Sequence, residues 1–237
     1  MKTVLGAVRR ADEDFGLIEA GDRVAVGVSG GKDSLLLLYA LSLYRKFCKN
    51  PFELYAVTLK LGLYDMDTSG IEEMCREIDV PYIIQETDIG DVVFNQRKEK
   101  NPCALCAKMR RGALCDVMNE HGFNKLALGH HRDDAIETLF LSMLYEGRIH
   151  TFHPKTFLSR SGITQIRPII YVSEKHIIHL ARTLELPVCK SQCPAAGDTK
   201  RDDIRRLLEH ITKDYPNARE LLLSALQNQD QYGLWDR

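Results

Sequence analysis

The sequence predicts an α/β fold, in which a twisted parallel sheet is covered by helices on both faces. Short apolar runs with strand character alternate with leucine-rich or amphipathic helical stretches, which is the pattern of β-α-β units. The first apolar run is followed by a turn rich in serine and glycine and then by a helix. Hydrophobic residues make up 44% of the 237 residues, which is enough for one full core.

The individual elements follow from periodicity, capping residues and turn residues. Apolar runs bounded by turn residues predict strands at residues 23–28, 53–59, 80–84, 125–128 and 165–170. Amphipathic or leucine-rich stretches predict helices at residues 4–15, from the phosphate turn through about residue 43, at 71–78, 104–121 and 135–141, at 174–184 after a cap at Ser173, and at 216–227. A further helix follows a capping box that begins at Thr199. Residues 95–101 and 149–166 are expected to be irregular.

The sequence has no linker, so we expect one domain over residues 1–237, with an N-terminal helix at about 4–15 and a helical annex at about 199–228. The net charge of -1 and the pI near 6.7 give no global attraction to nucleic acid, so any RNA contact needs a local basic patch. No apolar run approaches membrane-spanning length, which predicts a cytoplasmic protein without a membrane partner. Seven cysteines, an odd number, favour metal or sulfur chemistry over a disulfide framework.

The turn at residues 29–34 has the composition of a phosphate-binding loop. Backbone N–H groups at a glycine turn and at a helix start point toward an anion. The turn lacks the six-position spacing of a Walker loop. The candidate nucleotide contacts are Ser29, Gly30, Gly31, Lys32, Asp33 and Ser34. The alternative is an ordinary turn in which Asp33 or Ser34 caps the helix.

A second turn between a strand and a helix begins at Gly129, which we also expect to contact the nucleotide. Asp133 and Asp134 follow it, and they either bind magnesium or orient a base, or else cap the next helix. We favour Asp134 for function. His130 and His131 are adjacent, so their side chains diverge and do not make a metal pair.

Three cysteines are candidate metal ligands. Cys103 and Cys106 lie three positions apart at a helix start, where the helix dipole favours thiolates, and Cys193 lies in a loop with proline and glycine. Three thiolates suit a [4Fe-4S] cluster with one open iron, which can hold a substrate sulfide. The alternative is a structural zinc held by these three together with Cys189. The remaining cysteines, Cys48, Cys75 and Cys115, are expected in the core.

The phosphate turn resembles that of the N-type ATP pyrophosphatases, which split ATP between the α- and β-phosphates. The order of five motifs narrows the resemblance to the tRNA 2-thiocytidine synthetase family. These motifs are Ser29–Ser34, Cys103–Gly112, Ala127–Phe140, Ile166–Pro168 and Cys193. The resemblance spans about residues 20–210 and implies a Rossmann-like fold of the adenine nucleotide alpha hydrolase type.

The resemblance implies ATP-dependent thiolation of a cytidine, at C2, in the anticodon loop of tRNA. It places a [4Fe-4S] cluster on Cys103, Cys106 and Cys193, and it implies ATP, Mg²⁺, a sulfur donor (cysteine desulfurase or sulfide) and a homodimer. Many members have a late cysteine pair with two residues between, whereas three residues separate Cys189 from Cys193, so Cys189 is not assigned as a ligand. The catalytic candidates are Lys32, Arg110, Asp133 and Asp134.

Two basic groups flank the expected centre and are candidates for RNA contact, or else for a solvated helix face. They are Lys98, Lys100, Lys108, Arg110 and Arg111, and then Lys200, Arg201, Arg205 and Arg206. Two other functions stay open at this point. One is an ATP pyrophosphatase with an amine nucleophile, and the other is a metal-stabilised RNA-binding module without catalysis. The related uridine-54 thiolases are disfavoured, because their flanking zinc-binding cysteine pairs are missing here.

Overall fold

The computed structural model describes residues 1–97, 102–189, 193–195, 199–228 and 233. Contacts divide the chain into two compact units. The first consists of Met1–His131 and His153–Ala196, and the second of Arg132–Phe152 and Gly197–Arg237. The expectation of one domain over residues 1–237 stays a prediction.

The first unit contains the sheet. Its strands are β1 (Arg23–Gly27), β2 (Glu53–Lys60), β3 (Tyr82–Glu86), β4 (Lys125–Ala127), β5 (Lys155–Leu158) and β6 (Ile163–Ile166). They form one sheet in the order β3-β2-β1-β4-β6-β5. Every pair in it is parallel except β5 with β6, which is antiparallel. The predicted α/β class with a mainly parallel sheet is confirmed, and the carboxyl ends of the parallel strands share one edge.

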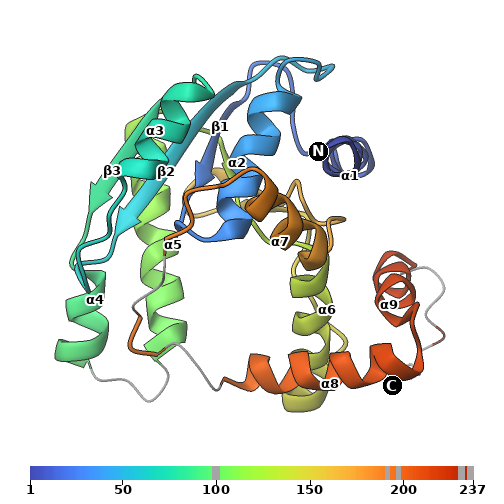
Figure 1. Ribbon diagram of the computed structural model, residues 1–237. Coiled ribbons are helices and arrows are strands. Elements are labelled where there is room, and N and C mark those ends of the chain that lie inside the picture. The colour runs from blue at the N-terminus through green and yellow to red at the C-terminus, as the bar shows by residue number, and fades with distance from the viewer. Residues whose placement is uncertain (98–101, 190–192, 196–198, 229–232, 234–237) are drawn as a thin grey trace. The chain divides into compact units, whose positions relative to one another are not determined.

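Helices of the first unit cover both faces of this sheet. They are α1 (Lys2–Phe15), α2 (Lys32–Tyr44), α3 (Ser69–Glu77), α4 (Ile89–Asp91), the π-helical segment η1 (Val92–Arg97), α5 (Pro102–Glu120) and α7 (Glu174–Thr183). Helix α5 packs on Ala25, Val57 and Leu126, whereas α2 lies on the opposite face with α1 and α7 beside it (Figure 1). Successive side chains of a strand point to opposite faces of the sheet, so β1 contributes side chains to the packing on both faces.

The second unit is helical. It contains α6 (Arg132–Leu141), the π-helical segment η2 (Ser142–Glu146), α8 (Lys200–Asp214) and α9 (Ala218–Gln227). Ile136, Ile204 and Leu208 form its buried core. The predicted capping box is present, since the Thr199 amide donates to the Asp202 carboxylate at 2.8 Å. Within the described ranges, none of the helices of either unit is long and apolar enough to cross a lipid bilayer.

Two expectations about irregular segments were wrong. Residues 149–166 were expected to be irregular and 165–170 to form a strand, but a β5–β6 hairpin lies here and its second strand ends at Ile166. Four-residue strands beside Pro154 and Gly162 carry too little periodicity to be read from sequence. Residues 95–97 belong to η1, in which Asp91 accepts hydrogen bonds from the side chains of Asn95 and Gln96. Residues 98–101 lie outside the described residues.

The burial of the central strand gives a stability prediction. Leu126 is fully buried between β1 and α5, whereas Phe157 on edge strand β5 is 65% exposed. We expect Leu126→Ala to lower the free energy of unfolding by about 2–5 kcal/mol, because it removes buried methyl groups and leaves a cavity. Phe157→Ala should change it by less than about 0.5 kcal/mol. Urea denaturation measures both, and equal losses would contradict the assigned core.

Candidate nucleotide and thiol site

The Ser29–Ser34 turn lies between β1 and α2, at the carboxyl edge of the sheet. The hydroxyl of Ser34 closes it: this oxygen accepts a hydrogen bond from the Ser29 amide at 3.1 Å and donates one to the Gly31 carbonyl at 3.0 Å. Ser34 is buried, whereas Ser29 is exposed. The turn is therefore fixed from its inner side and open on its outer side.

Two glycines give this turn its shape. Gly30 has a φ of +77°, and a Cβ there would lie 2.5 Å from Met66 Cε and 3.0 Å from Cys189 Cβ. Gly31 is the N-cap of α2 and has no side chain to cap the helix. The alternative of an Asp33 or Ser34 cap is therefore wrong, since α2 has already begun at Lys32. The uncapped N–H groups of the first turn remain available to an anion.

Gly129 follows β4 and packs directly on the start of α2. A Cβ on it would lie 2.9 Å from the Ser34 amide nitrogen and 3.0 Å from the Asp33 carbonyl carbon. This close approach explains, by packing alone, why position 129 requires a glycine. Its expected contact with the nucleotide stays a prediction.

The charges at the turn are organised around Lys32. Its ammonium lies 3.1 Å from Asp33 Oδ1 and 3.0 Å from Glu174 Oε1. Burial lowers the pKa of Lys32, but the two carboxylates outweigh it and the net pKa is raised. Asp33 also lies 3.6 Å from Nε2 of the buried His131. The sequence pattern did not identify Glu174 or His131 as partners of the turn.

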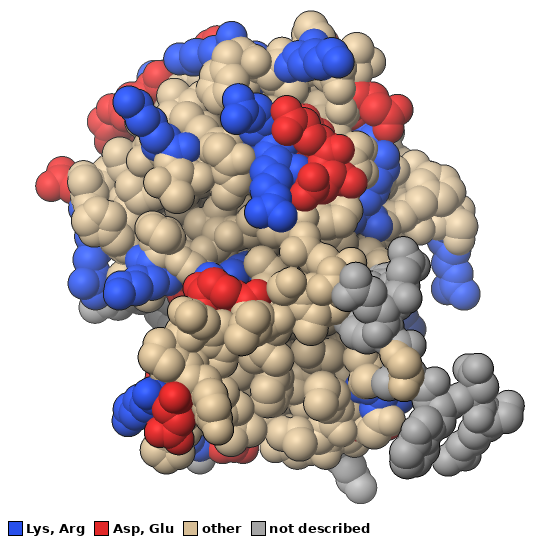
Figure 2. Space-filling model, turned by 90° about the vertical axis from the view of Figure 1, so that its right-hand side faces the viewer, with Lys and Arg blue, Asp and Glu red and all other residues tan. Residues whose placement is uncertain are grey.

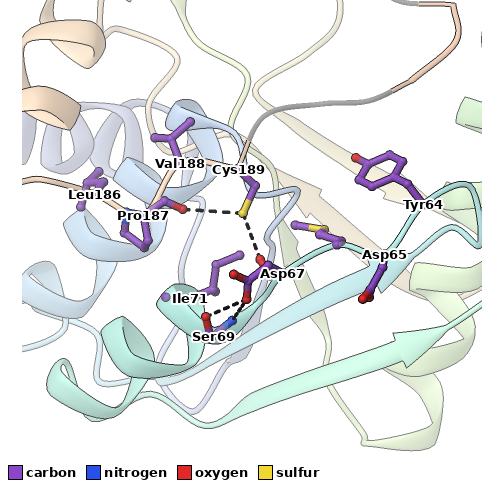
Figure 3. Close-up of a pocket in the computed structure, with 11 residues that line it drawn as sticks. Tyr64, Asp65, Asp67, Ser69, Ile71, Leu186, Pro187, Val188 and Cys189 are labelled. Atoms are coloured by element: carbon purple, nitrogen blue, oxygen red, sulfur yellow. Dashed lines mark hydrogen bonds between the residues drawn. The ribbon is translucent and has the colours of Figure 1, made fainter.

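A cavity of about 580 Å³ opens beside Gly30 (Figure 3). It is lined by residues 64–67, 69–71 and 186–189. The Cys189 amide donates to the Gly30 carbonyl at 2.9 Å, which ties this wall to the turn. The Cys189 thiol donates to the Asp67 carbonyl at 3.4 Å. Of these residues, only Cys189 was singled out from the sequence, as an alternative zinc ligand. Residues 64–67 and 69–71 follow the second strand, and residues 186–189 follow α7.

The N-terminal half of α5 carries the predicted cysteine pair outside the core. The buried residues of α5 are Cys115, Val117 and Met118, all in its C-terminal half. Cys103 is exposed and Cys106 is half-buried. The helix thus presents its first turns to solvent while its last turns hold the sheet.

The thiol of Cys106 lies within electrostatic reach of both other predicted ligands. Burial raises the pKa of Cys106, the charge of Arg110 opposes this, and Cys193 and Cys103 raise the pKa further. The charge of Arg110 therefore acts on the Cys106 thiol, and the expected catalytic role of Arg110 stays a prediction. Across the described part of the chain, no three His, Cys, Asp or Glu side chains meet closely enough to hold a single metal ion.

Cys189 has a different environment from these three thiols. Burial raises its pKa, and the Asp67 carboxylate raises it further. Its place against Gly30 does not support the alternative zinc site that used it as a fourth ligand. Cys193 follows Cys189 by four residues. The chain therefore limits the distance between the backbones of Cys189 and Cys193 to about 14 Å.

Asp133 and Asp134 lie in the second unit, in the first turn of α6. Asp133 pairs with Arg219 at 2.5 Å, and Asp134 pairs with Arg201 at 3.3 Å. The Asp134 side chain is 16% exposed, compared with 6% for Asp133. Both have arginine partners, so neither depends on a metal ion for neutralisation.

The two predicted basic groups differ in their partners. In the second, Arg201 and Arg205 pair with the buried Glu137, Arg206 pairs with Asp203, and Lys200 lies 4.3 Å from the centre of the Tyr145 ring. This group therefore has partners within the second unit, and both RNA contact and a solvated helix face stay predictions for it. Lys108, Arg110 and Arg111 are exposed on α5. Lys98 and Lys100 lie outside the described residues.

Surface charge is mixed where it is visible from one side. Figure 2 shows basic and acidic side chains side by side on that face, which agrees with the net charge of -1. A broad part of the same face has few charged side chains.

Comparisons with known proteins agree with this geometry. The PP-loop domain family matches residues 7–211. A tRNA-cytidine(32) 2-sulfurtransferase of Citrifermentans bemidjiense is 38% identical over 97% of this chain and 91% of its own length. One of Geobacter sulfurreducens is 39% identical over 96% and 90%.

A solved structure has the same fold. It is the U34-tRNA thiolase NcsA from Methanococcus maripaludis with its [4Fe-4S] cluster, which is 26% identical with a TM-score of 0.78 and covers 95% of this chain and 77% of its own. The identity to the curated relatives extends over nearly the whole chain. The chain belongs to the PP-loop family and, within it, to the tRNA 2-thiocytidine synthetases.

Proposed function

We propose that this protein is an ATP-dependent tRNA thiolase, which replaces the C2 oxygen of a cytidine in the anticodon loop by sulfur. The observation that carries the proposal is the electrostatic interaction of the Cys106 thiol with those of Cys103 and Cys193, in the same unit as the phosphate turn. An amine-transferring enzyme has no use for three such thiols. The relatives named tRNA-cytidine(32) 2-sulfurtransferase support cytidine 32 as the target.

The first unit supplies a nucleotide site. We infer that MgATP binds with its phosphates on the N–H groups of Gly30, Gly31 and the start of α2. Lys32 then neutralises the charge of the leaving pyrophosphate. The cavity beside Gly30 takes the adenosine end, because about 580 Å³ lies within the usual range for small ligands.

The reaction has two displacements. The cytidine C2 oxygen attacks the α-phosphorus of ATP. The bond between the α-phosphorus and the oxygen that bridges to the β-phosphorus breaks, and pyrophosphate leaves. A sulfide then attacks C2, the C2–O bond breaks, and AMP leaves with the oxygen. The net products are thiolated cytidine, AMP and pyrophosphate, and the sulfide comes from a cysteine desulfurase or from free sulfide.

Cys103, Cys106 and Cys193 fit a [4Fe-4S] cluster. In a cubane each thiolate binds a different iron, so the three sulfur atoms need not meet at one point as they would around a single ion. A cluster on three cysteines supplies an iron without a protein ligand, at which sulfide can be delivered. Burial raises the pKa of Cys106, and the positive charge of Arg110 offsets part of this increase.

The other assignments complete the proposal. Of the two aspartates, we assign the functional role to Asp134, because its carboxylate is the more exposed of the pair. The exposed cations of α5 contact phosphates of the tRNA. We further propose a single catalytic domain that acts in the cytoplasm as a homodimer.

The nucleotide assignment is tested at Lys32. We expect Lys32→Ala to lower tRNA-dependent formation of AMP from ATP by about 10²- to 10³-fold, because a charge is lost where pyrophosphate leaves. The exposed Lys49→Ala is the control and should keep the wild-type rate. Wild-type AMP formation in Lys32→Ala would contradict the assignment.

The cysteines give a paired test after anaerobic purification. We expect about four iron and four sulfide per wild-type chain, and a brown colour that is lost in Cys193→Ala. Cys189→Ala should keep both, because Cys189 lies against Gly30. Stoichiometric zinc in place of iron, or equal loss in the two variants, would refute the cluster assignment.

The basic group on α5 is tested by the salt dependence of tRNA binding. Lys108→Gln and Arg111→Gln should each reduce the slope of log affinity against log salt by about 0.7, if each contacts one phosphate. Arg9→Gln, an exposed cation on α1, serves as the control. An unchanged slope in both α5 variants would exclude these contacts.

A further inference from the structure

The ammonium of Lys32 lies between carboxylates from two different helices. Asp33, its neighbour on α2, contacts it at 3.1 Å, and Glu174, the first residue of α7, contacts it at 3.0 Å. The side chains of Lys32 and Glu174 are 29% and 28% exposed, so the pair is partly shielded from water. A pair of this kind is screened less than an exposed one.

The backbone of Glu174 is held in place independently of Lys32. Ser173 caps α7, since its side chain accepts a hydrogen bond from the His176 amide, and its Oγ lies 2.8 Å from His176 Nδ1. A carboxylate in the first helical turn is favoured by the helix dipole. Helix α7 also packs on α2. The carboxylate of Glu174 is thus a fixed point beside the phosphate turn.

A carboxylate at a fixed position can hold the ammonium of a lysine in one place. The four-carbon side chain of lysine is flexible, and holding its ammonium in one place costs conformational entropy. A pair with a carboxylate on another helix sets that place before the nucleotide arrives. Protein kinases use a lysine–glutamate pair in this way at their phosphate site. Asp33 cannot replace Glu174 in this role, because it lies on the same helix as Lys32 and is shared with His131.

We propose that Glu174 is a positioning residue, which holds the ammonium of Lys32 where pyrophosphate leaves. This inference rests on the proposed function, because that function assigns Lys32 to the pyrophosphate. It adds a residue outside the phosphate turn, the cysteines and the two aspartates of α6. The role is indirect, since Glu174 acts through Lys32.

The test compares Glu174→Gln with Glu174→Asp in tRNA-dependent AMP formation. We expect Glu174→Gln to lower kcat about tenfold with the KM for ATP within about twofold, because Lys32 is misplaced rather than lost. Glu174→Asp keeps the charge and should recover most of the rate. Glu53→Gln, which breaks a 3.1 Å pair with Arg23 at the opposite edge of the sheet, is the matched control.

The pH profile adds a readout that a purely structural role does not change. The charged or titratable groups around Lys32 are Asp33 on α2 and Glu174 on α7, with His131 beside Asp33. Removal of one carboxylate lowers the pKa of Lys32, so the alkaline limb of kcat should move to lower pH in Glu174→Gln.

The outcomes separate the two proposals. If the wild-type protein forms no AMP with tRNA and a sulfur donor, the proposed function fails. If the wild type is active and Glu174→Gln keeps its kcat and alkaline limb, the positioning role is wrong. A lower melting temperature, with equal losses in Glu174→Gln and Glu174→Asp and no shift of the limb, would also overturn it.

Discussion

The nucleotide turn depends on two glycines that neighbouring atoms approach more closely than a Cβ allows. At Gly30, a Cβ would collide with Met66 and Cys189, and at Gly129 it would collide with the backbone of Asp33 and Ser34. The first contact sets the wall of the cavity, and the second seats the start of α2 on the end of β4. The N–H groups of the turn and the ammonium of Lys32 take their places from these contacts. The proposed adenylylation therefore depends on close packing at these two glycines before it depends on any catalytic side chain.

The sequence was sufficient to predict those elements and caps whose determining residues are neighbours along the chain. Residues 24–34 predict a strand, turn and helix because apolar run, glycines and leucines follow one another directly, and the caps at Ser173 and Thr199 were found for the same reason. The β5–β6 hairpin was missed because its strands have four residues each and the residues around them favour loops. Non-local contacts were also missed. Glu174 meets Lys32, and Cys189 meets Gly30, only after the chain has folded.

The ion pairs separate basic residues with buried acidic partners from basic residues that are exposed, and composition alone does not show this difference. Arg201 and Arg205 are separated from Glu137 by more than sixty positions, yet this buried glutamate pairs with both. Leaving Glu137 unpaired would cost several kcal/mol, so these arginines are needed within the second unit. Within the described residues, the exposed cations of α5 pair with no buried carboxylate, and they lie within two helix turns of Cys106. If tRNA binds as proposed, its phosphates and the thiols meet on one short stretch of helix.

The central claim is that the activated base is a cytidine and the incoming atom is sulfur. Mass spectrometry of tRNA nucleosides tests it most directly, in a strain that lacks the gene and in the same strain with the gene restored. The account predicts that 2-thiocytidine is lost in the deletion strain and returns on restoration, while other thiolated nucleosides are unchanged. An unchanged level of 2-thiocytidine in the deletion strain would contradict it.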